Sequence, residues 1–168
     1  MFHRCQVAGL STSFPHLLQI ARTVKTILLV EDDDNDAYMM RMACHRSGIP
    51  HAFRVVMDGD AAVEYLSGAG KFTDRTAHPM PDVVFLDIHM PRRDGHSVLK
   101  WIRAQSALEH LPVIMLTGSN QATDVTEAYL LGATSYLQKM GDPAEFGQAV
   151  RIILKYWLEL HINPPSGR

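Results

Sequence analysis

Short apolar runs and segments with helical spacing alternate along most of the chain. The third apolar run, Val83 to Leu86, has no polar interruption and ends directly in the carboxylate of Asp87. Uninterrupted apolar runs of this length are typical of strands that are buried on both faces of a sheet. The five runs predict strands at 26–30, 52–57, 82–87, 111–117 and 135–139.

After each predicted strand, apolar residues recur every three or four positions, which predicts an amphipathic helix. Asp142 and Pro143 supply a cap and a first turn for the last helix. Five strand–helix units in succession predict one α/β domain with a doubly wound parallel sheet. The predicted helices cover 36–46, 58–66, 96–105, 120–131 and 143–160.

Composition narrows the class of protein. With 46% apolar and 20% charged residues, the chain is typical of a globular domain, and a net charge of −2 offers no basic surface for nucleic acid or an anionic membrane. Cys5 and Cys44 fit neither a CxxC motif nor a zinc site, so we expect free thiols in a reducing compartment. With no apolar run of about 18 residues, the expected location is the cytoplasm.

The two ends of the chain lie outside the alternating pattern. Residues 1–24 are expected to form a mobile N-terminal extension, although Phe14, Leu17 and Leu18 leave a short helix as an alternative. Residues 25–160 are expected to form the domain, and 161–168 a C-terminal tail.

Polar side chains follow four of the five predicted strands. Glu31 and Asp32 follow the first, Asp87 ends the third, Thr117 ends the fourth and Lys139 ends the fifth. Parallel strands end at one edge of a sheet, so these side chains are expected to converge there. Grouped carboxylates repel one another unless a cation is bound, and an oxygen-only ligand set favours a hard ion such as Mg²⁺.

The same side chains suit the binding of a phosphoryl group. Lys139 offers a positive charge, and the hydroxyl of Thr117 can donate a hydrogen bond. Asp87, an accessible carboxylate beside a cation, can act as a nucleophile and form an acyl phosphate. Catalysis would then come from positioning and from charge neutralisation.

Four motifs together resemble the receiver domain of two-component response regulators. They are V-E-D at 30–32, F-L-D-I-H-M-P-R-R-D-G at 85–95, L-T-G at 116–118 and G-A-T-S-Y-L-Q-K at 132–139. The resemblance covers about residues 25 to 160. It implies a flavodoxin-like (CheY-like) α/β fold with five parallel strands in the order 2-1-3-4-5 and five helices. It also implies a signalling protein, not an enzyme, that receives a phosphoryl group from a histidine kinase.

The resemblance assigns roles to residues of the predicted site. Asp87 would be the phosphoacceptor and Lys139 the lysine that contacts the phosphoryl group. Asp32 would bind Mg²⁺ directly, Glu31 would bind it through water, and the backbone carbonyl of His89 would be a further ligand.

Other residues would transmit or time the signal. Thr117 and Tyr136 would form the switch pair, and the side chains of His89 and Ser119 are expected to affect the lifetime of the phosphorylated state. One residue departs from the family pattern, because Met140 follows the lysine where most receivers have proline. Without proline a cis bond is unfavourable, so we expect a trans peptide there.

A narrower resemblance concerns the partners. The long loop before Asp82 and the K-Y-W-L sequence at 155–158 are similar to single-domain regulators of phytochrome-type histidine kinases. Such a kinase and a downstream protein would be the partners. A homodimer through the fourth helix, fifth strand and fifth helix is a further expectation, since the adjacent Tyr156 and Trp157 cannot both face the core.

Two other functions remain open at this stage. The first is a pseudo-receiver, which would bind a partner without being phosphorylated. The second is an aspartate-based phosphatase of the haloacid dehalogenase type, although that family requires an acid where this chain has His89. A DNA-binding regulator is disfavoured, because no residues beyond the domain could form a helix-turn-helix and the net charge is slightly negative.

Overall fold

A computed structural model describes residues 24–118 and 122–162. The N-terminal extension, Cys5, Ser119 and the predicted helix cap at Asn120 lie outside the described residues. The strands are β1 (Lys25–Val30), β2 (His51–Val56), β3 (Val83–Asp87), β4 (Val113–Thr117) and β5 (Ser135–Gln138). The helices are α1 (Asp34–Arg46), α2 (Gly59–Ser67), α3 (Gly95–Arg103), α4 (Ala122–Leu130) and α5 (Pro143–Leu154).

The five strands form one parallel sheet in the order β2-β1-β3-β4-β5, as the resemblance implied. In the register of the sheet, Leu86 lies beside Val30 and Asp87 beside Leu116. Thr117 in turn lies beside Gln138, one residue before Lys139. The polar side chains at the ends of β1, β3, β4 and β5 therefore lie at one edge of the sheet.

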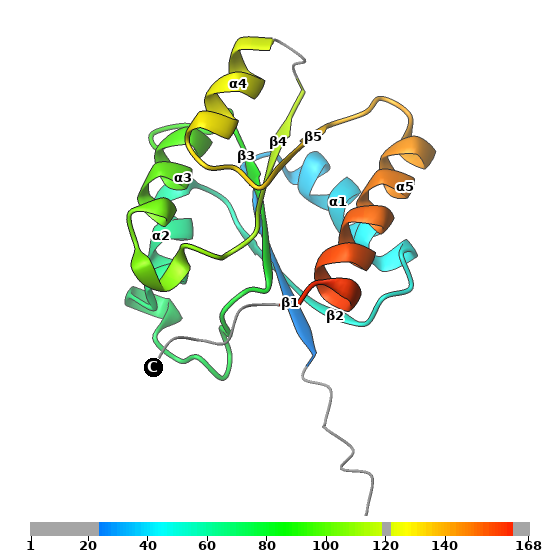
Figure 1. Cartoon of the computed structure of the whole chain (residues 1–168). Coiled ribbons are helices and arrows are strands. Elements are labelled where there is room, and N and C mark those ends of the chain that lie inside the picture. The colour runs from blue at the N-terminus through cyan, green and yellow to red at the C-terminus, as the bar shows by residue number, and fades with distance from the viewer. Residues whose placement is uncertain (1–23, 119–121, 163–168) are drawn as a thin grey trace, which may run out of the picture.

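Helices cover both faces of the sheet (Figure 1). On one face, α1 and α5 enclose a core that includes Leu29, Phe85 and Leu116. On the other face, α2 and α3 enclose a second core that includes Leu28 and Leu86, and α4 contributes Ala128. The central strands β1, β3 and β4 thus bury both of their faces, which explains why they are apolar runs, whereas the edge strands β2 and β5 are only partly buried.

An aspartate caps each of the helices α1, α2, α3 and α5. Asp33 accepts hydrogen bonds from the backbone N–H groups of Asn35 and Asp36 at the start of α1. Asp58, Asp94 and Asp142 cap α2, α3 and α5 in the same way, and the predicted cap at Asp142 is confirmed. Many of the acids that follow the strands therefore begin helices, since a carboxylate satisfies the first N–H groups of a helix.

The loop between β3 and α3 folds back against the end of β3. The N–H of Gly95 donates to the carbonyl of Ile88 over 3.0 Å. A Cβ at position 95 would lie 2.2 Å from the carbonyl oxygen of Asp87, so only glycine fits. This close approach fixes the loop that carries His89.

The predicted elements differ from the structure mainly at their ends. β4 begins at Val113 because Pro112 has no N–H for the sheet. Two short 3₁₀ turns, Gly70–Phe72 and Ser106–Leu108, lie between the predicted helices and strands. The last helix, predicted as continuous, changes to a π-helix at Lys155–Leu160.

The π-helical end carries the adjacent aromatic residues. The hydrogen bond from the N–H of His161 to the carbonyl of Tyr156 closes this last turn at 2.7 Å. Tyr156 is 50% exposed, whereas Trp157 is partly buried against the core beneath α1 and α5. The prediction that the two aromatics face different surroundings is confirmed.

None of the described helices is both long enough and apolar enough to cross a membrane.

Candidate functional site

Three carboxylates converge where β1 and β3 end. Glu31 and Asp32 directly follow β1, and Asp87 is the last residue of β3. One oxygen from each lies within 4.8 Å of the others. Glu31 and Asp87 are only 2% and 3% exposed, whereas Asp32 faces solvent. Asp87 is therefore not the accessible carboxylate that the sequence predicted, and the cluster combines two buried carboxylates with an exposed one, Asp32.

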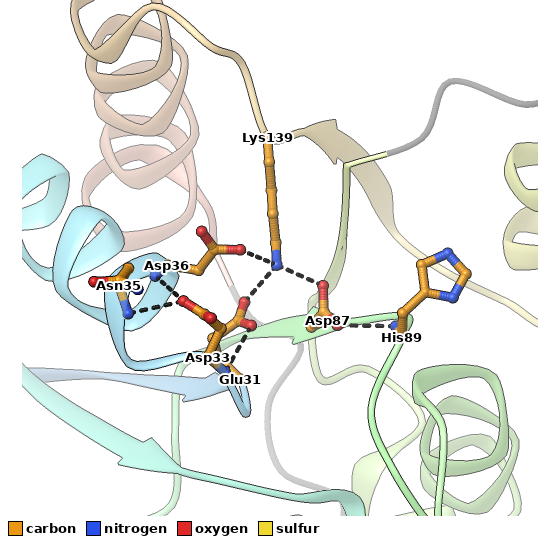
Figure 2. Close-up of polar contacts among 7 residues, drawn as sticks. All are labelled: Glu31, Asp33, Asn35, Asp36, Asp87, His89 and Lys139. Carbon is orange, nitrogen blue, oxygen red and sulfur yellow. Dashed lines mark hydrogen bonds and ion pairs between the residues drawn. The ribbon is translucent and has the colours of Figure 1, made fainter.

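Lys139 reaches into this cluster from the end of β5 (Figure 2). Its backbone N–H donates to the carbonyl of Thr117 over 2.7 Å, which continues the sheet past Gln138. Its ammonium Nζ lies 2.7 Å from each of three carboxylate oxygens, namely Glu31 Oε2, Asp36 Oδ2 and Asp87 Oδ1. Residues at the ends of β1 and β3 and in the first turn of α1 are thereby joined through one positive charge.

The surroundings shift the protonation of the buried groups. Burial is the main reason that the pKa of Glu31 is raised to about 7. The hydrogen bond from Lys139 lowers this pKa, and the nearby charge of Asp87 raises it. Burial alone would lower the pKa of Lys139, but its hydrogen bonds to Asp36, Asp87 and Glu31 outweigh burial and hold that pKa above its usual value. Lys139 is therefore charged at neutral pH.

The donor set fits a hard divalent cation. Three carboxylates, from Glu31, Asp36 and Asp87, contact the ammonium of Lys139, and a fourth, from Asp32, lies beside two of them, so negative charge is in excess. All the donors are oxygen atoms, which Mg²⁺ prefers, and one or two carboxylates with water are its usual protein ligands. The residues present therefore suit the ion that the sequence predicted.

The second oxygen of Asp87 has a backbone partner. The N–H of His89 donates to Asp87 Oδ2 over 2.8 Å. The imidazole ring of His89 is exposed, and it lies on the side of Asp87 away from Glu31 and Asp36 (Figure 2). The carboxylate of Asp87 is thus held between an ammonium and an amide, and an imidazole lies nearby.

Thr117 and Tyr136 lie on neighbouring strands at the same edge. Thr117 is fully buried at the end of β4. Tyr136 is paired with Met115, two residues before Thr117, so both side chains lie on the same face of the sheet. Tyr136 is partly buried and packs against the core beneath α2 and α3. Ser119, the other predicted site residue of this region, lies outside the described residues.

The segment after β5 has the predicted trans backbone. Met140 occupies the position where most receivers have proline, and no cis peptide bond occurs in residues 24–118 and 122–162. The absent proline has not displaced the lysine, since the Lys139 ammonium still reaches Asp87.

Asp36 is the one site residue that the sequence reasoning missed. The sequence pattern predicts Asp36 only as the first residue of a helix. Its contact with Lys139 depends on how α1 packs over the end of β1, which the spacing of residues does not reveal. The only signal was a further acid one helical turn after Asp33.

Known proteins place this fold and site in one family. The family model for the response regulator receiver domain matches residues 27–151. The chain therefore belongs to the receiver domain family, and the predicted resemblance is confirmed.

The similar proteins narrow the resemblance. Response regulator Rcp1 of Synechocystis is 33% identical over 142 residues, which are 84% of this chain and 95% of Rcp1. A response regulator in red light signalling of R. palustris, RPA3017, is 34% identical with a TM-score of 0.80, covering 85% of this chain and all of that one. The structure of the Mn²⁺-bound form of Rcp1 is 33% identical in sequence with a TM-score of 0.74, and the match covers 84% of this chain and 99% of that one. The chain resembles single-domain phytochrome response regulators.

Proposed function

We propose that this protein is a single-domain response regulator that accepts a phosphoryl group on Asp87 from a histidine kinase. The observation that carries the proposal is the ion pair between Lys139 and Asp87 inside a carboxylate cluster at the sheet edge. The buried carboxylate of Asp87 has a charge partner in Lys139 and adjoins the exposed acid Asp32. The phosphorylated state would then act through contacts with other proteins, in the cytoplasm.

The transfer requires one bond to form and one to break. A carboxylate oxygen of Asp87 attacks the phosphorus of a phosphohistidine, and the phosphorus–nitrogen bond breaks. The imidazole leaves with the electron pair and takes a proton from solvent. The Lys139 ammonium faces the negative charge on the phosphoryl oxygens, while the N–H of His89 orients the carboxylate. This chain's contribution is positioning and charge, not acid–base chemistry.

The carboxylate cluster would hold Mg²⁺ during this transfer. Asp32 and Asp87 would bind it directly, Glu31 through water, and the His89 backbone carbonyl would complete the protein ligands. The ion would neutralise charge between the incoming phosphoryl group and the carboxylates. The excess of negative charge in the cluster and the Mn²⁺-bound form of the similar protein Rcp1 support this assignment.

Thr117 and Tyr136 would convert phosphorylation into a change of surface. Thr117 would move its hydroxyl towards the phosphoryl oxygens, and the Tyr136 ring would turn into the space it leaves. Their common face of the sheet supports this coupling. The change would reach the surface formed by α4, β5 and α5.

The similar proteins and the exposed apolar residues support two proposed partners. Regulators in phytochrome and red light signalling favour a phytochrome-type histidine kinase as the phosphodonor. Ile152 on α5, Tyr156 on the π-helical turn after α5 and Leu130 on α4 are all at least half exposed. They would support a homodimer through α4, β5 and α5. Sedimentation of wild type and of Ile152→Glu tests it, and an unchanged oligomeric state would argue against this surface.

Incubation with Mg²⁺ and acetyl phosphate tests the proposed function. We expect wild type to take up one label that is lost in base or in hydroxylamine, as an acyl phosphate is. Asp87→Asn should take up no label. A folded wild type that is not labelled would support the pseudo-receiver. Continuous release of phosphate from many equivalents of a small phosphate ester would support the phosphatase.

A further inference from the structure

We propose that Asp36 is a positioning residue for Lys139, which holds the ammonium beside Asp87 when the other carboxylates engage a cation. This inference rests on the proposed function. Lys139 contacts three carboxylates at 2.7 Å (Figure 2). Two of them, Glu31 and Asp87, belong to the cluster that would bind the cation, and Asp36 does not.

Because only Glu31 and Asp87 belong to the cation cluster, their role toward Lys139 differs from that of Asp36. A cation draws the oxygens of Glu31 and Asp87 towards itself and weakens their pairing with the ammonium. The carboxylate of Asp36 stays available to Lys139. A lysine side chain is a flexible four-carbon stem, and it loses rotamer freedom when its ammonium is fixed in an ion pair. Without a fixed partner outside the cluster, the ammonium would turn to solvent more often.

The placement of Asp36 is set by a rigid element. The backbone N–H of Asp36 donates to the capping carboxylate of Asp33 over 2.9 Å, which fixes the first turn of α1. The next residues on the inner face of α1, Ala37 and Met40, are buried against the sheet. Asp36 therefore presents its carboxylate from a packed helix to a lysine that follows the end of β5.

A simpler explanation is that Asp36 only stabilises the start of α1. Acids in the first turn of a helix interact favourably with the helix dipole. Asp34 lies in the same turn, carries the same charge and is exposed, so it serves as a matched control. A dipole effect alone would make Asp36→Asn and Asp34→Asn behave alike, whereas positioning of Lys139 would separate them.

The kinetic test follows phosphorylation by acetyl phosphate at saturating Mg²⁺. In Asp36→Asn we expect the maximal rate to fall by about threefold or more, because a partly exposed ion pair contributes a modest free energy. The half-saturating concentration of acetyl phosphate should stay equal or fall, since one negative charge near the anion is lost. Asp34→Asn should leave both quantities unchanged, and Asp36→Glu should restore part of the rate.

A second measurement does not depend on activity. The side-chain ammonium of Lys139 gives a ¹H–¹⁵N signal in NMR when it is held in an ion pair, and Lys139→Gln identifies that signal by its loss. In Mg²⁺-saturated wild type and Asp34→Asn we expect a sharp signal, and in Asp36→Asn a signal broadened or lost by exchange with water.

The outcomes distinguish this inference from the proposed function. An unlabelled wild type would overturn the proposed function, while the ammonium signal would still decide the role of Asp36. An Asp36→Asn protein with an unchanged or higher maximal rate would overturn the positioning role. A wild-type ammonium signal that is absent with Mg²⁺, or unaffected by Asp36→Asn, would also overturn it.

Discussion

The Lys139 ammonium lies 2.7 Å from Asp87 Oδ1, although the two residues come from strands separated by β4. This ion pair forms because a parallel sheet brings its carboxyl ends to one edge and the backbone of Lys139 continues β5 by bonding to Thr117. The charge that would stabilise a phosphoryl group is therefore in place before any donor arrives. Such preorganised charge is a major source of catalysis in phosphoryl transfer.

The lifetime of a phosphorylated Asp87 should depend on His89. The His89 ring is exposed and lies beside Asp87, on the side away from Glu31 and Asp36. We expect His89→Ala to lose its label faster, because removing the ring opens the approach of water to the acyl phosphate. The measurement is the decay of the label after the phosphodonor is removed. A decay rate equal to that of wild type would remove His89 from the timing of the signal.

The switch pair should respond to a phosphoryl mimic. With Mg²⁺ and beryllofluoride, we expect the ring signals of Tyr136 to shift in NMR, because the ring turns from its present packing. In Thr117→Ala the shift should be much smaller, since no hydroxyl moves towards the mimic. Tyr129, which is half exposed on α4, provides an internal comparison. If the environment of Tyr136 is the same with and without the mimic, the proposed coupling is wrong.

Stability should depend on the close approach at Gly95. Since a Cβ at this position would meet the Asp87 carbonyl at 2.2 Å, Gly95→Ala should lower the free energy of unfolding by about 2–3 kcal/mol. Gly147, within α5, is the matched control, because its added Cβ meets nothing within 4 Å. Gly147→Ala should raise the free energy of unfolding by about 0.5–1 kcal/mol. Urea titration measures both, and equal effects would contradict the contact.

The buried thiol of Cys44 should make stability depend on alkaline pH. Burial raises the pKa of Cys44 to about 12, whereas an unfolded thiol titrates at about 8.5. Between these values the unfolded chain loses a proton that the folded chain keeps, so the free energy of unfolding falls by up to about 1.4 kcal/mol per pH unit.

The measurement uses a Cys5→Ser background, in which one thiol remains. Urea titrations from pH 7 to pH 10 should show this slope, and Cys44→Ala should reduce it. Native Cys44 should also react slowly with a thiol reagent at pH 9. Rapid labelling, or the same slope in both proteins, would show that the thiol is not buried.

The sequence was sufficient to predict the strand order through the family resemblance and to predict which strand ends converge. Both depend on short-range pattern and on topology, because buried parallel strands are apolar and end at one edge. The contact between Asp36 and Lys139 could not be predicted, since it depends on how α1 packs over β1. The π-helical end at 155–160 was also missed, because its apolar spacing is close to that of an α-helix.

The central claim is that Asp87 is the residue that carries the phosphoryl group. Its most direct test is to label the protein with acetyl phosphate and Mg²⁺, reduce it with borohydride and sequence the peptides by mass spectrometry. Reduction converts an aspartyl phosphate into homoserine, so we expect homoserine at position 87 in wild type. Homoserine at another aspartate, or a label that persists in Asp87→Asn, would contradict the claim.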